Sequence, residues 1–375
     1  MVKKQEKGRF TTNDHYSLGV EIEFQILDRK TLNLAPLAPL LIKNSPKLLA
    51  TRITHEFISS ILELQTNACR SVRDVENDLM QTCSMAAELA ENNGCILYAA
   101  SLHPFAKDTE QSVSRDARYE RIMEELQILG TKFISQGLHV HVGMPDGDTA
   151  MRFCNIVQLY LPLLLALSTS SPYCKGIDTG LMSYRTKLFE VLPHAGIYGF
   201  FKNWRTFKAE AADMIRLGVI DSTRDLWWDA RPNEEFGTVE IRICDLPGRF
   251  ADILALVAFI QGLAAYIVEE RKEQSPISLQ ILRANKWQAV RHGLKGSFVD
   301  SSAHLHGQKM TCDEAIVLLL DKIKPYADNL GGASYLQTLD RILQNGTSAQ
   351  RQREIYTKSG SFEDVIVKMH EEFWI

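Results

Sequence analysis

The chain has 375 residues, of which 45% are hydrophobic and 23% are charged, and its formal net charge at pH 7 is −4. This composition is typical of a globular protein, and the weak negative charge excludes the strongly basic surface expected of a nucleic-acid-binding domain. The seven cysteines are scattered and form no C-x-x-C pair, so we expect neither a disulfide framework nor a zinc site, and a cytoplasmic location fits.

No segment predicts a secretory leader or a membrane span. Residues 1–15 carry lysines but no apolar stretch of the kind found in signal peptides. The most apolar run, residues 156–167, is too short to cross a bilayer and contains Gln158 and Pro162. We therefore expect a core helix there and no membrane partner.

Residues 17–27 predict a strand with one buried face. Apolar side chains alternate with Glu21 and Glu23, so both carboxylates lie on the second face, with their Cα atoms roughly 6.5–7 Å apart. One interpretation is a solvated outer face. The other is a pair of oxygen ligands for Mg²⁺, which prefers carboxylates together with phosphate and water.

The next elements follow in chain order, by the same reasoning from period and caps. Strands are expected at 60–67, 95–104, 137–143 and 238–246, and a helix begins after Ser71 and ends at Gly94. Arginines at 115, 118 and 121 indicate a helical segment, and the helix at 148–168 should bend at Pro162. Further helices are expected at 250–273, 277–291, 313–323, 335–344, 349–358 and 363–373.

These elements predict one α+β domain, residues 1–375, with an antiparallel-rich sheet faced by helices. The strand-rich part covers about 15–250 and the helical part about 250–375. Neither a low-complexity linker nor a repeat of fixed period divides the chain.

Three later strands repeat the pattern of the first. Each alternates an apolar face with a face of metal- or phosphate-binding side chains: Glu63 and Gln65, His139 and His141, Glu240 and Arg242. Solvated faces usually carry Lys, Thr, Ser and Glu, so four such strands favour one shared polar site. Carboxylates gathered there would raise one another's pKa unless divalent cations lay between them.

The number of carboxylates suits Mg²⁺, or alternatively Mn²⁺, carrying a nucleoside triphosphate. Arg242 could then neutralise phosphate oxygens or clamp a substrate carboxylate with its planar fork. The sequence has neither a Walker A motif nor a nucleophile paired with a base, so metals and side chains would have to hold the phosphates.

Five motifs occur in one order: GVEIEF at 19–24, ELQT at 63–66, GLHVHVG at 137–143, DTGLMSYR at 178–185 and GTVEIR at 237–242. With KWQAVRHGL at 286–294, they make the chain resemble the glutamate–cysteine ligase type 2 family, specifically the YbdK-like carboxylate–amine ligases.

The resemblance implies a glutamine-synthetase-like fold, in which a curved antiparallel sheet holds the active site on its concave face and helices pack on the other. It implies ATP and Mg²⁺ as cofactors and the joining of an amino acid carboxylate, as an acyl phosphate, to an amine. Glutamate and cysteine are the reference substrates, on which relatives can be weak, and a homodimer is compatible with it.

The resemblance also assigns roles by position. The implied metal ligands are Glu21, Glu23, Glu63, Glu240 and His141, and the residues implied beside the nucleotide are His139, His141 and Glu240. Arg242 and Arg185 would be catalytic. The implied substrate contacts are Ser183, Arg185 and Arg118.

Two alternatives stay open at this stage. A metal-dependent amide hydrolase also uses H-x-H on a strand, but it would show alternating βα units and turnover without nucleotide. A non-catalytic nucleotide-binding homologue would keep the fold and lose the ligands.

Overall fold

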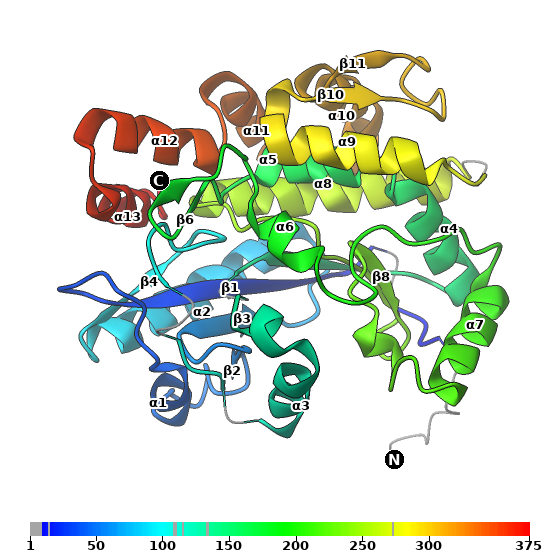
Figure 1. Ribbon diagram of the computed structural model, residues 1–375. Coiled ribbons are helices and arrows are strands. Elements are labelled where there is room, and N and C mark those ends of the chain that lie inside the picture. Colours follow the sequence, from blue (N-terminus) through cyan, green and yellow to red (C-terminus); the bar gives the residue numbers. More distant parts are fainter. Residues whose placement is uncertain (1–9, 14–15, 108–110, 115, 133–134, 272–273) are drawn as a thin grey trace.

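The computed structural model describes residues 10–13, 16–107, 111–114, 116–132, 135–271 and 274–375 (Figure 1). Its strands are β1 (Leu18–Asp28), β2 (Ile53–His55), β3 (Ile61–Gln65), β4 (Cys95–Tyr98), β5 (Leu138–Gly143), β6 (Tyr173–Cys174), β7 (Ile177–Asp178), β8 (Ala230–Asn233), β9 (Thr238–Ile241), β10 (Ser297–Val299) and β11 (Lys309–Thr311).

Its helices are α1 (Ala38–Lys43), α2 (Val72–Glu91), α3 (Ala117–Leu126), α4 (Gly147–Val157), α5 (Leu161–Ser168), α6 (Arg185–Phe189), α7 (Trp204–Arg216), α8 (Phe250–Glu269), α9 (Leu279–His292), α10 (Cys312–Asn329), α11 (Ala333–Asn345), α12 (Ser348–Ser359) and α13 (Phe362–Glu371). A 3₁₀ helix, η2 (Gln127–Lys132), follows α3.

A seven-stranded sheet organises the molecule. Its strand order is β2-β3-β1-β5-β9-β8, and β4 pairs with the second half of β1. All of its ladders in the described residues are antiparallel. The βα alternation that a barrel hydrolase requires is therefore absent from this sheet, and the expected α+β fold with an antiparallel sheet is confirmed.

The apolar face of β1 lies in the main core. Its five alternating apolar side chains are at most 2% exposed: Leu18, Val20, Ile22, Phe24 and Ile26. The second face is also shielded, because Glu23 is 7% exposed and Gln25 is fully buried with its amide donating to the Ala100 carbonyl. A solvated outer face is therefore the wrong interpretation of this strand.

Helices cover the apolar face and extend into a helical layer. α2 packs on β1, β3 and β4, and α8 packs on β5. In Figure 1, α8 to α13 lie together on one side of the sheet, while α3 lies beside β3. The opposite, polar face of the sheet is therefore free of these helices, and α3 and the segment around α6 lie next to it.

Several boundaries differ from the expected ones. The expected strand at 95–104 is paired only over β4, and the expected bent helix at 148–168 is two helices, α4 and α5, that meet at 66°. Pro162 stands in the first turn of α5, where its missing N–H costs nothing but its ring blocks the preceding turn. The capping box at Thr311–Glu314 is confirmed.

One described helix, α8, is long and apolar enough to cross a membrane, and 94% of its most apolar window is buried inside the protein. A core helix of a soluble protein meets the same criteria, and α4 with α5 does so only as a bent pair.

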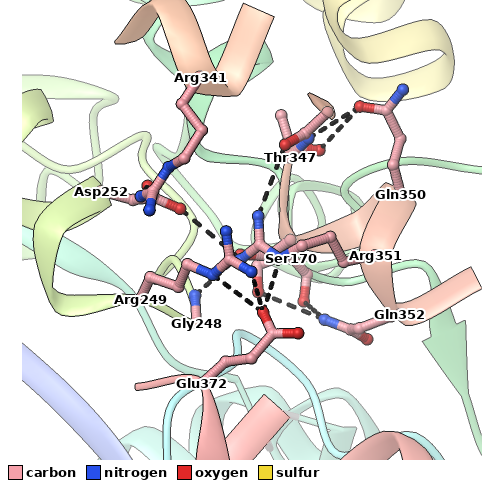
Figure 2. A network of polar contacts seen from close by, with 12 residues as sticks. Ser170, Gly248, Arg249, Asp252, Arg341, Thr347, Gln350, Arg351, Gln352 and Glu372 are labelled. Atoms are coloured by element: carbon pink, nitrogen blue, oxygen red, sulfur yellow. Dashed lines mark hydrogen bonds and ion pairs between the residues drawn. The ribbon is translucent and has the colours of Figure 1, made fainter. Parts of the chain in front are cut away.

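A buried ion-pair network fixes the C-terminal helices to α8 (Figure 2). Glu372 accepts hydrogen bonds from Arg249 Nε at 2.9 Å and from Arg351 Nε at 3.1 Å. Arg351 also lies 3.6 Å from Asp252, which pairs with Arg341. Each carboxylate therefore holds together guanidinium groups that would otherwise repel one another.

We expect Glu372→Gln to lower the free energy of unfolding by about 2 kcal/mol, because it leaves two mostly buried guanidinium groups without a shared counter-charge. Urea unfolding followed by circular dichroism measures the change. The matched control is Asp213→Asn, which removes an exposed pair with Arg216 and should cost less than about 0.5 kcal/mol. Equal costs for the two variants would contradict a stabilising role for the network.

His103 is a buried neutral histidine. It is 3% exposed, its Nε2 donates to the Leu32 carbonyl at 2.8 Å, and its Nδ1 accepts from the amides of Phe105 and Ala106. Burial lowers the pKa of His103 from 6.5 to about 4. A proton on Nδ1 would face two N–H donors, so the fold excludes the charged form.

Because the folded protein binds fewer protons at His103 than the unfolded chain does, this contribution to stability is fully present above pH 6.5 and is lost as the pH falls toward 4. We expect His103→Gln to remove roughly 3 kcal/mol of that pH dependence. Urea unfolding of both proteins at pH 7 and pH 4.5 tests this, and parallel pH profiles would contradict it.

Candidate active site

Strand register brings the acidic and imidazole side chains of three strands together. Glu21 of β1 stands opposite His139 of β5, and Glu23 of β1 stands opposite Glu63 of β3. His139 Nδ1 lies 3.2 Å from Glu21 Oε2 and 4.0 Å from Glu23 Oε1. His141 Nε2 approaches Glu21 Oε1 to 3.3 Å. The predicted convergence of these strands is thus seen in the geometry.

The next strands add a carboxylate held between two arginines. Glu240 of β9 stands opposite His141 of β5 and opposite Arg231 of β8. Arg231 Nη2 donates to Glu240 Oε2 at 2.8 Å, and Arg242 pairs with the other oxygen. Glu240 is 3% exposed, so both arginines neutralise a buried charge.

These side chains line a single cavity of about 360 Å³ on the polar face of the sheet. Its lining includes five carboxylates, two histidines and three arginines: Glu21, Glu23, Glu56, Glu63, Glu240, His139, His141, Arg224, Arg231 and Arg242. The rest of the lining is largely aromatic and aliphatic.

The carboxylates are compensated unevenly. Burial opposes the charge of Glu240, but Arg242 and Arg231 hold the pKa of Glu240 well below its usual range. Burial likewise opposes the charge of Glu21, and its contacts with His139 and His141 lower its pKa. These two carboxylates are charged in the folded protein.

On the β3 side the balance is reversed. Burial, reinforced by the charges of Glu56 and Glu21, raises the pKa of Glu63 well above its usual range. Burial and the charge of Glu23 raise the pKa of Glu56 to about 7. This side of the cavity therefore lacks positive charge for its carboxylates.

The donor set fits divalent cations. Two groups of possible ligands, each with donor atoms within 4.8 Å of one another, are present: Glu21, His139 and Glu240, and Glu23, Glu63 and His139. Among the described residues, the buried Nε2 atom of His139 has no hydrogen-bond partner, and His141 Nε2 has only the ion-pair contact with Glu21. The carboxylate oxygens of these groups are the ligands that Mg²⁺ and Mn²⁺ prefer.

Ser183 is not brought to this cavity. It is fully buried, and its hydroxyl donates to Asp245 Oδ1 at 2.9 Å. Asp245 also accepts from the amide of Ser170 and the hydroxyl of Ser171. Ser183 therefore lies behind the cavity lining, held by Asp245, and the substrate contact expected from the sequence stays a prediction.

Arg185 lies beside the cavity and does not line it. Its guanidinium stacks on Phe189 at 4.8 Å and lies against Gly137, where an added Cβ would come within 2.3 Å of Nη2. Arg185 lines a recess of about 20 Å³ that shares Phe189, Trp227 and Arg242 with the main cavity. Gly137 thus provides the space for this arginine.

Arg118 belongs to α3, but its side chain lies outside the described residues. Three charged cavity residues, Glu56, Arg224 and Arg231, were missed from the sequence. Arg231 precedes Pro232, which argues against a strand, although Pro is tolerated in an edge strand such as β8. Glu56 follows the three-residue strand β2, which is too short to show alternation.

Comparisons with known proteins agree with this geometry. The model of the family described as glutamate-cysteine ligase family 2 (GCS2) matches residues 17–367. A protein of Gloeobacter violaceus, provisionally assigned as a glutamate–cysteine ligase 2, is 36% identical over 366 residues, which cover 96% of this chain and 97% of the relative. A Bdellovibrio bacteriovorus protein with the same provisional assignment is 36% identical over 371 residues, or 97% of this chain and 96% of the relative.

Solved structures show the same fold at low sequence identity. The glutamate–cysteine ligase of Francisella tularensis, in complex with AMP, superposes with a TM-score of 0.72 at 15% identity, covering 97% of this chain and 90% of that one. A bifunctional glutathione synthetase of Pasteurella multocida gives a TM-score of 0.67 at 15% identity, covering 96% of this chain and 51% of that one. The ligase fold expected from the sequence is confirmed.

If Glu63 serves a metal, Glu63→Gln should lower Mn²⁺ affinity at least about tenfold, measured by isothermal titration calorimetry. It should also raise the thermal midpoint of the metal-free protein, because it removes one of several repelling buried carboxylates. The matched control is Glu354→Gln on the exposed side of α12, which should change neither quantity. Unchanged Mn²⁺ affinity in Glu63→Gln would contradict the assignment.

Proposed function

Because the chain belongs to glutamate–cysteine ligase family 2, we propose that it is an ATP- and Mg²⁺-dependent ligase that joins a carboxylate to an amine through an acyl phosphate. The observation that carries the proposal is the meeting of carboxylates, imidazoles and guanidinium groups from four neighbouring strands in one cavity. The AMP bound to the Francisella ligase supports nucleotide use by this fold.

The acidic and imidazole groups would hold Mg²⁺, or Mn²⁺ in its place. The residues that fit are Glu21, Glu23, Glu63, Glu240, His139 and His141. A bound divalent ion would supply charge neutralisation for a triphosphate, which phosphoryl transfer needs more than it needs a protein nucleophile. It would also satisfy the β3 side, where Glu63 and Glu56 have no cationic partner among the cavity-lining residues of that side.

The two arginines would act on the phosphates. Arg242 and Arg231 share the buried Glu240, which fixes both guanidinium groups at the cavity wall before any substrate arrives. Groups held in advance stabilise developing charge without reorganisation. Arg185, fixed against Gly137 and Phe189, would support Arg242 from behind, since its Nη2 donates to the Arg242 carbonyl at 3.4 Å.

The proposed reaction has two steps. A carboxylate oxygen of the acid takes the terminal phosphoryl group, and ADP leaves. The amine nitrogen then attacks the carbonyl carbon, the C–N bond forms, the C–O bond to phosphate breaks, and the nitrogen loses a proton. The cavity walls would exclude water, which would otherwise hydrolyse the activated acid.

An amino acid is the proposed acid and a primary amine the proposed nucleophile, with glutamate and cysteine as the reference pair. We place the reaction in the cytoplasm, where ATP is abundant. All seven cysteines are free, which suits a reducing compartment.

The double variant Glu21→Gln, Glu23→Gln should lower substrate-dependent ADP release at least about 100-fold, because two charged cavity carboxylates are lost. A coupled ADP assay over amino acid and amine pairs measures this, with the amide confirmed by mass. Glu354→Gln should release ADP at the wild-type rate. ADP release at full rate in the double variant would contradict the metal assignment, and amide hydrolysis without ATP would favour the hydrolase alternative.

A further inference from the structure

Part of the cavity is lined by apolar side chains, and only one of them, Phe189, has a part in the proposed steps, through its contact with Arg185. We call this set the apolar wall; its members are Phe57, Tyr119, Ile122, Leu126, Phe189, Leu192 and Trp227. They come from the segment after β2, from α3, from α6 and the segment that follows it, and from the segment before β8. Neither glutamate nor cysteine carries a group large enough to need such a wall.

Strand register places the apolar wall at one end of the cavity. Glu23 and Glu63 are opposite each other, and the chain after β2 continues past this level through Glu56 to Phe57. The hairpin between β8 and β9, with Phe236, lies at the other end, beside His141 and Thr238. The two ends are therefore separated along the strands by the ligand groups.

Packing alone does not explain the wall. Six of these side chains form a small cluster of their own, separate from the main core, and Tyr119 contacts Phe57 of that cluster. Only Leu126 and Leu192 in it are buried, at 8% and 7% exposure, whereas Phe57, Ile122 and Trp227 remain partly exposed and face the cavity. Partly exposed apolar side chains around a cavity are the usual lining of a small-molecule site.

Charge divides the cavity in the other direction, across the strands, although the segment that carries the arginines also contributes Trp227 to the wall. The three arginines of the lining, Arg224, Arg231 and Arg242, all belong to the segment 224–242 at the β8–β9 side. Phosphates therefore favour that side, with Phe236 available for a base. Glu56, which the proposed metal site does not use, directly precedes Phe57 at the wall, so a cationic group is favoured there.

We propose that the apolar wall binds an aromatic or branched aliphatic group of the amine substrate, whose ammonium group is attracted by Glu56. This inference rests on the proposed ligase function for its chemistry. It makes the amine a hydrophobic one and distinguishes this site from one shaped for cysteine.

Calorimetry on the full-length protein with Mg²⁺ and a non-hydrolysable ATP analogue tests the inference through binding. 2-Phenylethylamine should bind about 10- to 100-fold more tightly than ethylamine, because both carry the same ammonium group and only the former buries a ring. Equal affinities of the two amines would overturn the inference.

A matched pair of substitutions locates the effect. Ile122→Asn should lower the affinity for 2-phenylethylamine about tenfold and leave the affinities for ethylamine and the ATP analogue unchanged. Ile128→Asn, the same change at a residue of η2 that is 71% exposed, should alter none of the three. If Ile122→Asn weakened the ATP analogue and not the amine, the wall would bind adenine and the inference would be overturned.

The comparison of the two amines uses the wild-type protein, so it remains valid even if the Ile122→Asn variant does not fold. Failure of the proposed function has a different signature: no acid and amine pair would produce ADP, whichever amine binds more tightly. If ADP release depended on substrates but the hydrophobic amine bound no more tightly than ethylamine, the proposed ligase function would stand and the inference about the apolar wall would be overturned.

Discussion

Burial of several carboxylates on one face of a sheet is the constraint on which the rest of the structure depends. Each carboxylate loses hydration and gains repulsion from its neighbours, so each must have a counter-charge or lose its own charge. Glu240 has two arginines and Glu21 has two imidazoles. Glu56 and Glu63 have mainly each other. The uneven supply of positive charge makes the β3 side of the cavity the place where a bound cation would relieve most repulsion.

The apolar face of the same sheet offsets the free-energy cost of burying these carboxylates. Apolar side chains of β1, β5 and β9 are almost fully buried beneath α2 and α8, and they hold the strands in a register that slippage by one residue would reverse. The same alternation that places valines and isoleucines in the core thus places the charged groups together. One period-two alternation therefore determines both the hydrophobic core and the polar cavity.

That pattern explains how much could be read from the sequence. Period-two alternation predicted the strands that carry Glu21, Glu63, His139 and Glu240, because each has a buried face. It could not give register, which depends on contacts between distant segments. It also missed Arg231, which stands in an edge strand with a proline, and Glu56, which follows a strand of three residues.

The helical segments show the same limit. α7 begins with Asn203, whose side chain accepts from the Thr206 amide, a capping signal that was present in the sequence but overlooked. Ser183 was assigned to the substrate from its motif, but its contacts with Asp245 place it in the layer behind. A motif shows which residues belong together, and only packing decides which of them reach the cavity.

The contact between Phe24 of β1 and Phe373, which follows α13, has a consequence for biosynthesis. The first long strand leaves the ribosome with its apolar face uncovered. α2 can cover part of that face early, but the ring that packs against Phe24 is translated near the other end of the chain. Contacts so remote in sequence form slowly and leave strand edges open to wrong pairing. We therefore expect the nascent chain to require chaperone protection for most of its translation.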